Sequence, residues 1–159
     1  MEVYFLRHGE AGKSSGGHGG DAARQLTEEG IARMEREAVF ISALRLRLDA
    51  IMTSPLVRAH QTAEIVAREL RLLDALAVDE RLSPGFGPEE LRGILREHRA
   101  ASALMLVGHE PDFSSTISAC IQGGRMECKK GGLARVDFDD PGSLTGTLVW
   151  LLPPRVMAP

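Results

Sequence analysis

The sequence predicts an α/β domain: a three-layer α/β/α sandwich with a mainly parallel sheet and an antiparallel edge. Apolar runs of strand length alternate with segments whose apolar residues recur at helical spacing, which is typical of strand–helix–strand units. The runs Val3–Leu6 and Ala103–Val107 are apolar without interruption, as in strands buried on both faces. Late in the chain, Leu133–Phe138 and Thr147–Leu152 flank an Asp-Pro-Gly turn and predict the antiparallel pair.

The predicted helices begin at recognisable capping residues. Thr27 is an N-cap ahead of two glutamates, whose charges suit the positive end of the helix dipole. Ser54 and Pro55 are expected as the cap and the first residue of the next helix, and Pro88 opens a third. The remaining expected elements are strands over Asp49–Thr53 and Ala75–Val78 and a helix over Asp112–Ile121 that stops at Gly123-Gly124.

With 159 residues the chain is long enough for one domain, expected over residues 1–152, followed by a frayed tail over 153–159. The net charge of -3 gives no indication of nucleic acid or an anionic membrane surface as a partner. No apolar stretch approaches the length of a transmembrane helix, and the N-terminus is too polar for a signal peptide. Cys120 and Cys128 lack a metal-like spacing, so we expect reduced thiols and a cytoplasmic protein.

Three predicted strands end in residues that carry chemistry. Arg7 and His8 follow the first strand, Arg58 lies in the first turn of the helix after the second, and His109 follows Ala103–Val107. The carboxyl ends of parallel strands meet at one edge of a sheet, where α/β proteins bind ligands. We therefore expect these side chains to converge. Two arginines and two histidines make a pocket for a dianion, since a guanidinium matches the geometry of phosphate.

Such a pocket suits phosphoryl transfer, in which fixed donors stabilise charge on the equatorial phosphate oxygens. His8 is the expected nucleophile, which attacks phosphorus and carries the phosphoryl group until water releases it. Its attacking nitrogen must be unprotonated, so the other ring nitrogen should donate to a fixed acceptor. Carboxylate clusters and His–Cys spacings typical of metal sites are absent from the sequence, and we expect neither a metal nor another cofactor.

Four segments, in this order, resemble the motifs of the histidine phosphatase superfamily, also called the phosphoglycerate mutase-like family. They are Arg7-His8-Gly9-Glu10, Leu26–Gly30, Ser54–Ala63 and Gly108-His109-Glu110-Pro111. The resemblance extends from Met1 to about Leu152 and implies a phosphoglycerate mutase-like fold. Within the superfamily, the segment Asp21–Thr27 is similar to one that SixA-type phosphohistidine phosphatases carry before their first helix.

The resemblance implies His8 as nucleophile, Arg7 and Arg58 as phosphate clamps, and His109 as a further phosphate contact. It also implies a contribution from backbone N–H groups after His109, which places Glu110 among the phosphate-binding residues. The implied substrate is a protein that carries phosphohistidine, with inorganic phosphate as the product.

The chain departs from the superfamily at two positions. Larger relatives use a glutamate after the third strand as general acid, whereas Pro84 stands where that acid is expected. The nearby acidic residues, which we expect to be solvated, are Glu80, Glu89 and Glu90. His60 stands where relatives often have glutamate.

Two features beside the site each allow two interpretations. Glu10 could handle a proton or form a salt bridge, and the salt bridge is favoured. The Gly/Ser-rich stretch from Gly12 to Gly20 is expected to be a mobile loop, with a substrate contact by Lys13 or Ser14 as the less favoured alternative.

Two alternatives to a phosphohistidine phosphatase remain open. One is a small-metabolite phosphatase or mutase of the same superfamily. The short segment between Asp79 and Leu91 argues against it, because small substrates are usually enclosed by longer lids. The other is an inactive module that binds phosphoproteins, and the presence of all four pocket residues argues against that.

Overall fold

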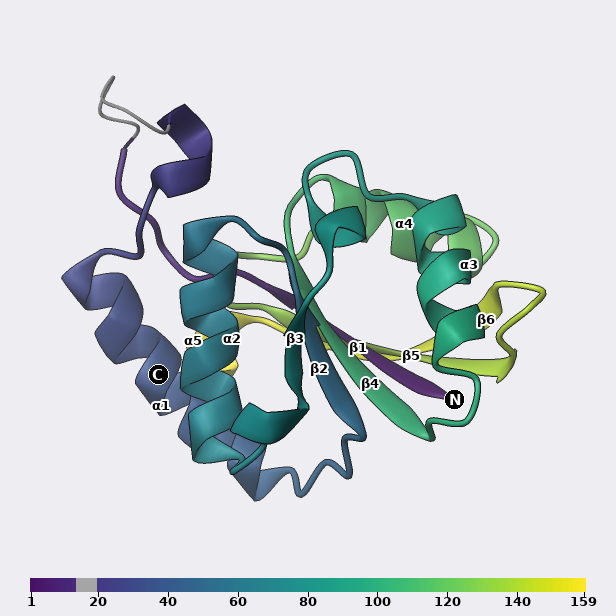
Figure 1. Cartoon of the computed structure of the whole chain (residues 1–159), viewed down its shortest axis with the longest axis horizontal. Coiled ribbons are helices and arrows are strands. Elements are labelled where there is room, and N and C mark those ends of the chain that lie inside the picture. Colours follow the sequence, from purple (N-terminus) through teal and green to yellow (C-terminus); the bar gives the residue numbers. More distant parts are fainter. Residues whose placement is uncertain (14–19) are drawn as a thin grey trace.

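The computed structural model describes residues 1–13 and 20–159, and these build a single six-stranded sheet with the order β3-β2-β4-β1-β5-β6 (Figure 1). The strands are β1 (Glu2–Arg7), β2 (Ala50–Thr53), β3 (Leu76–Val78), β4 (Ala103–Gly108), β5 (Leu133–Asp140) and β6 (Thr145–Leu152). The first four are mutually parallel, and β5 and β6 form the antiparallel edge. The predicted fold class is confirmed.

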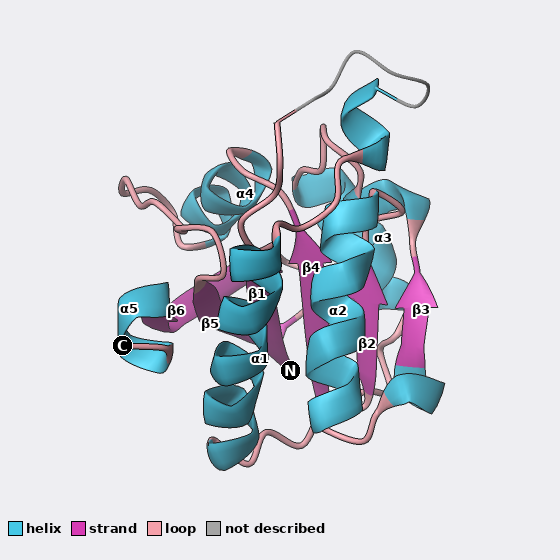
Figure 2. Cartoon of the chain, turned by 90° about the vertical axis from the view of Figure 1, so that its left-hand side faces the viewer, coloured by secondary structure: helices cyan, strands magenta, loops and turns pink. Residues whose placement is uncertain are grey.

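Helices cover both faces of the sheet, as Figure 2 shows from a second side. One face carries α1 (Glu28–Ala43), α2 (Val57–Glu69) and α5 (Pro154–Met157), and the other carries α3 (Pro88–Glu97) and α4 (Asp112–Cys120). The connections that the structure describes contain three short 3-10 helices: η1 (Gly20–Ala23), η2 (Leu73–Ala75) and η3 (Glu80–Leu82). Within these described residues, no helix is long and apolar enough to cross a membrane.

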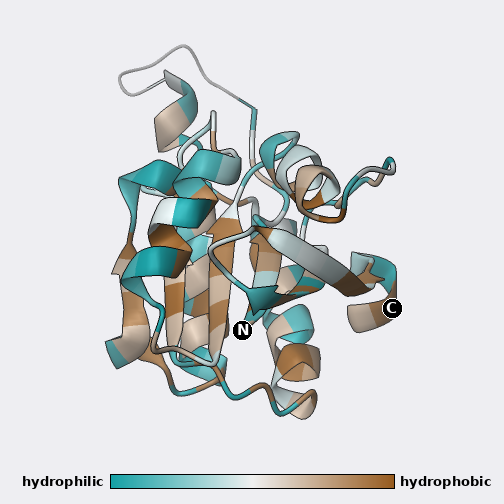
Figure 3. Ribbon diagram, turned by 90° about the vertical axis from the view of Figure 1, so that its right-hand side faces the viewer, coloured by the Kyte–Doolittle hydropathy of each residue, from teal (hydrophilic) through white to brown (hydrophobic). Residues whose placement is uncertain are grey.

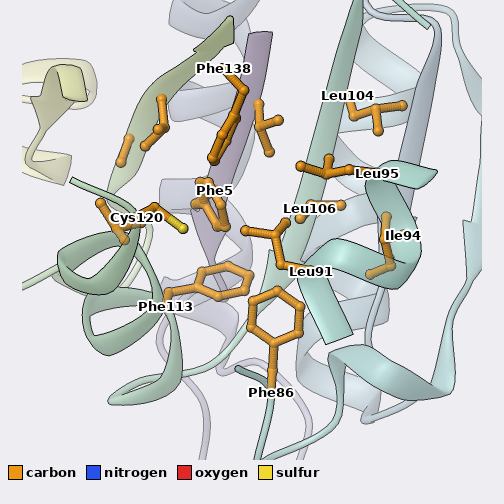
Figure 4. Close-up of a cluster of buried hydrophobic side chains, with 14 of the residues drawn as sticks. Phe5, Phe86, Leu91, Ile94, Leu95, Leu104, Leu106, Phe113, Cys120 and Phe138 are labelled. Carbon is orange, nitrogen blue, oxygen red and sulfur yellow. The ribbon is translucent and has the colours of Figure 1, made fainter. Parts of the chain in front are cut away.

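The continuous apolar strands supply two hydrophobic cores because alternate side chains point to opposite faces. Val3 and Phe5 of β1 belong to the core under α3 and α4, where Phe5 meets the ring of Phe113 edge-on at 5.3 Å (Figure 4). Tyr4 and Leu6 belong to the core under α1 and α2. Figure 3 shows hydrophobic residues along the central strands.

Helix starts follow the sequence with one exception. The Thr27 side chain accepts a hydrogen bond from the Gly30 N–H at 2.9 Å, as its N-cap role predicts. The expected start at Ser54-Pro55 is wrong, because α2 begins at Val57 with Leu56 as its N-cap. Ser54 instead prolongs β2, since its N–H donates to a carbonyl of β4 at 3.0 Å.

The prediction of a frayed tail over 153–159 is also wrong. Pro154–Met157 forms the short helix α5, which packs against α1. Met157 is only 3% exposed, so the tail contributes an apolar side chain to the core.

Glu37 of α1 is a fully buried carboxylate under the loop that precedes β5. Its partner is Arg33, with Nε 3.3 Å from Oε1, and a side chain at Gly131 would collide with its carboxylate. The N–H of Gly131 in turn donates to the carbonyls of Arg7 and His8, both at 3.1 Å. Burial raises the pKa of the Glu37 carboxyl to about 7, despite Arg33 nearby.

We expect Glu37→Gln to stabilise the protein above pH 7. The pKa is higher in the folded chain than in the unfolded one, so stability is lost as pH rises from about 4.5 to about 7 and the carboxyl ionises. The neutral amide avoids that loss, worth about 1–3 kcal/mol, and the gain should vanish near pH 4. Thermal unfolding across this pH range measures it, with the exposed Glu35→Gln as control. An equal shift at all pH values would contradict the assignment.

Candidate active site

The register of β1 against β4 places two histidines side by side. Arg7 at the end of β1 lies opposite Gly108 at the end of β4. The N–H of His8 then donates to the Gly108 carbonyl at 3.1 Å, which extends the pairing by one residue. His8 and His109 therefore leave adjacent strands together, and their ring centroids are 5.2 Å apart.

The His8 imidazole is buried and has a defined proton arrangement. Its Nδ1 lies 2.7 Å from the Gly9 carbonyl oxygen. A carbonyl can only accept, so Nδ1 carries the proton and Nε2 keeps its lone pair. Burial, reinforced by the neighbouring His109 and Arg58, lowers the pKa of His8 to about 3, so the ring is neutral at pH 7. The Gly9 carbonyl is thus the fixed acceptor that a histidine nucleophile requires.

Two arginine side chains flank His8. Arg58, at the start of α2 and only 5% exposed, donates from Nε to His8 Nε2 at 3.2 Å. Arg7 donates from Nη1 to the Cys128 carbonyl at 2.9 Å. The buried Nε of Arg7 has no hydrogen-bond partner among residues 1–13 and 20–159. A buried donor without a partner is rare in folded proteins, and an anion oxygen would satisfy it.

His109 is oriented by Ser54. Its Nε2 lies 2.8 Å from the Ser54 hydroxyl, which also accepts the N–H of Leu56 at 3.2 Å. The buried Nδ1 of His109 has no partner in the described part of the chain. When the Ser54 hydroxyl donates to Nε2, Nδ1 carries a proton and can donate to an anion. Burial, aided by the charge of Arg58, lowers the pKa of His109 to about 4 and keeps this ring neutral too.

A buried threonine fixes the remaining geometry. The Thr62 hydroxyl accepts the N–H of Gly9 at 3.1 Å and donates to the carbonyl of Arg58 at 2.8 Å. It therefore ties the residue after His8 to the first turn of α2. Neither this role nor the contact between Ser54 and His109 was predicted. Both residues lie within the Ser54–Ala63 motif, and their spacing there is the one signal the sequence offers.

Glu110 lies beside the site, and its carboxylate is engaged elsewhere. Its Oε1 accepts the N–H of Ser114 in the first turn of α4 at 3.2 Å, and burial raises the pKa of this carboxyl. Together with α4 and the segment 124–127 it lines a cavity of about 530 Å³. The phosphate contact expected at Glu110 stays a prediction.

Other residues singled out in the sequence have structural partners. Glu10 forms an ion pair with Lys130 at 2.7 Å, the favoured of its two interpretations. His60 lies 3.8 Å from Glu64 on a partly exposed face of α2. Ser14 and most of the Gly12–Gly20 loop lie outside the described residues.

Two of the three acidic residues near Pro84 are tied to their own segment. Glu90 accepts the N–H of Gly87 at 3.0 Å as part of the start of α3, and Glu89 pairs with Arg92 at 3.4 Å. Glu80 is exposed. In the described part of the chain, no group of three or more His, Cys, Asp or Glu residues is arranged to hold a metal ion.

A family model for the histidine phosphatase superfamily (branch 1) matches residues 3–102. The chain belongs to this superfamily. An uncharacterised protein of Picosynechococcus is 33% identical over 96% of this chain and all of its own length. Phosphohistidine phosphatase SixA of Escherichia coli is 24% identical over 97% of this chain and 94% of its own.

Solved structures of other phosphatases share the fold. The structure of the protein histidine phosphatase SixA complexed with tungstate superposes with a TM-score of 0.87 at 23% identity, covering 99% of both chains. An Escherichia coli structure described as an alpha-ribazole-5'-P phosphatase superposes with a TM-score of 0.75 at 17% identity, covering 97% of both. The fold is therefore common to phosphatases described with different substrates, and it does not by itself select one.

We expect Ser54→Ala to lower phosphatase kcat/KM about tenfold to a hundredfold while the fold is retained. The substitution removes the contact that orients His109 and leaves His109 Nε2 without its partner, and a misplaced donor stabilises the transition state poorly. Steady-state kinetics and thermal unfolding measure the two effects. Ser102→Ala, at an exposed serine before β4, is the matched control. Unchanged activity would show that Ser54 does not orient His109 for the reaction.

Proposed function

We propose that this histidine phosphatase superfamily member is a metal-independent phosphatase that dephosphorylates phosphohistidine in proteins through a covalent intermediate on His8. One observation carries the proposal. The His8 Nε2 lone pair is held unprotonated by the Nδ1 contact to Gly9, 3.2 Å from the guanidinium of Arg58. Two further buried nitrogens, on Arg7 and His109, lack partners among the described residues, as expected of donors that form their hydrogen bonds only to a bound anion.

The reaction follows from these positions. The phosphoryl group enters between His8 and the two arginines, and His8 Nε2 attacks phosphorus in line with the leaving nitrogen. Arg58 Nε, which contacts the lone pair in the free protein, then donates to a phosphoryl oxygen, as do Arg7 and His109. The substrate ring carries a proton on its other nitrogen, so when the bond to phosphorus breaks and its electron pair stays on the substrate nitrogen, the ring departs as neutral imidazole. Water attacks the phosphohistidine at His8, releasing inorganic phosphate and restoring the neutral ring.

The choice of a phosphohistidine substrate is supported by the segment that contains Pro84. This short connection is fixed to α4, because the Gly85 N–H donates to Asp112 Oδ2 at 2.8 Å. Phe86 is buried and packs against Phe113 with ring centroids 5.6 Å apart. A connection tied down in this way does not act as a mobile lid, which favours a substrate carried on a protein surface. Proline donates no proton, and an imidazole leaving group, far less basic than an alkoxide, needs general-acid help least.

The alternative substrates and partners fit the site less well. A small-metabolite phosphatase or mutase would have to protonate an alkoxide, and Glu89 and Glu90 are engaged with Arg92 and Gly87. An inactive binding module would not need an unprotonated His8.

The proposed partners are therefore a phosphohistidine protein and inorganic phosphate, without nucleic acid or membrane. A cytoplasmic location belongs to the same proposal, supported by two free, buried cysteines.

The nucleophile is tested with His8→Ala. We expect the variant to lose turnover while keeping the thermal stability of the fold, because no other imidazole in the described part of the chain accepts a hydrogen bond from Arg58. Wild-type protein quenched during turnover should carry an acid-labile phosphate on His8, located by mass spectrometry. His98→Ala, at the end of α3, is the control and should retain activity. Undiminished turnover by His8→Ala would rule out the mechanism.

The substrate class is tested by comparing catalytic efficiencies. We expect kcat/KM on phosphohistidine proteins to exceed that on alkyl phosphates such as phosphoglycerate by about a hundredfold to ten-thousandfold, the usual contribution of a general acid. Activated aryl phosphates should lie between the two, because their leaving groups are weak bases. Equal efficiency on phosphoglycerate or a sugar phosphate would refute the assignment to phosphohistidine and leave the phosphatase chemistry intact.

A further inference from the structure

The Arg58 guanidinium already forms an ion pair with a carboxylate, that of Asp21. Arg58 donates from Nη1 to the backbone carbonyl of Asp21 at 2.8 Å and from Nη2 to Asp21 Oδ2 at 2.9 Å. Its Nε points the other way, to His8 Nε2 at 3.2 Å. A single residue of η1 therefore holds the outer end of the guanidinium while the inner end faces the nucleophile.

Asp21 is itself fixed by a second arginine. Arg24 donates from Nη1 to Asp21 Oδ1 at 2.7 Å and from Nε to the Gly12 carbonyl at 2.7 Å. These arginines lower the pKa of the Asp21 carboxyl, so it carries a negative charge at neutral pH. The helix η1 lies beyond the N-terminal end of α2, at the edge of the sheet where the site is built (Figures 1 and 2).

This arrangement has two physical consequences. A guanidinium is a rigid planar fork, so fixing both Nη atoms also fixes the direction of Nε. The negative charge of Asp21 also lies beside the guanidinium that would hold a phosphate dianion. Two negative charges at such short distance repel each other. The side chain of Asp21 is 56% exposed, whereas that of Arg58 is 6% exposed, so Asp21 is the part of the pair that solvent and incoming anions reach first.

We propose that Asp21 is a positioning residue that directs Arg58 toward His8, and that its charge weakens the binding of inorganic phosphate at the same guanidinium. The inference rests on the proposed function, in which phosphate is the product that must leave. An anion that orients the clamp and also competes with the product favours release after hydrolysis.

Two substitutions separate orientation from charge. Asp21→Asn keeps the backbone contact and a side-chain acceptor and removes the charge. It should bind inorganic phosphate roughly 1.5-fold to fivefold more tightly, the range for loss of one exposed charge interaction. Asp21→Ala also removes the side-chain acceptor, and its kcat should fall by about tenfold or more as Arg58 loses its direction. Because Asp21→Asn retains a side-chain oxygen for Arg58, its kcat should fall less than that of Asp21→Ala.

Calorimetric titration of the full-length protein with inorganic phosphate measures the binding without requiring turnover. Asp74→Asn, an exposed carboxylate of η2, controls for the change in net charge and should leave phosphate binding unchanged. A purely structural role for Asp21 predicts weaker phosphate binding and a lower melting temperature in both variants, and that result would overturn the inference. So would unchanged phosphate binding in Asp21→Asn, while the phosphatase function would stand. A wild-type protein that neither binds phosphate nor hydrolyses phosphohistidine would overturn both.

Discussion

The parallel pairing of β1 with β4 is the constraint on which the site depends. Arg7 lies opposite Gly108, and the pairing continues through the N–H of His8 to the Gly108 carbonyl. A shift of one residue would turn His8 to the other face of the sheet, because side chains alternate along a strand. The register is itself fixed by the two cores, since Val3 and Phe5 must face α3 and α4 while Tyr4 and Leu6 face α1 and α2.

The hydrogen-bond partners of His8 and His109 give two residues of one type different roles. The pKa values of His8 and His109 are lowered to about 3 and about 4, mainly by desolvation, so both rings are neutral at pH 7. The partner of each ring then decides which nitrogen carries the proton. Gly9 offers only a carbonyl, which leaves His8 Nε2 as an electron-pair donor. Ser54 offers a hydroxyl, which lets His109 present an N–H to an anion.

The positive charge of the site is partly compensated before any ligand binds. Arg7 contacts a backbone carbonyl, and Arg58 contacts both the carbonyl and the carboxylate of Asp21. Buried guanidinium groups need such partners, because removal of a charge from water is costly. The same partners set the direction of each donor, and a fixed donor stabilises a transition state without reorganising during the reaction. Compensation and orientation are thus supplied by the same contacts.

The sequence by itself determined the fold class and the meeting of four side chains, Arg7, His8, Arg58 and His109. They follow strand-length apolar runs, and parallel strands share their carboxyl edge. Only the tertiary structure decided what supports them. Ser54 carried a cap signal but prolongs β2, since pairing with β4 outweighs a local preference worth about 1 kcal/mol. Thr62 and Asp21 reach the site from α2 and η1, and no local pattern reports contacts across such distances in the chain. The prediction that residues 153–159 are frayed was wrong for a similar reason. Whether Met157 is buried depends on the position of α1 and not on the residues next to Met157 in the sequence.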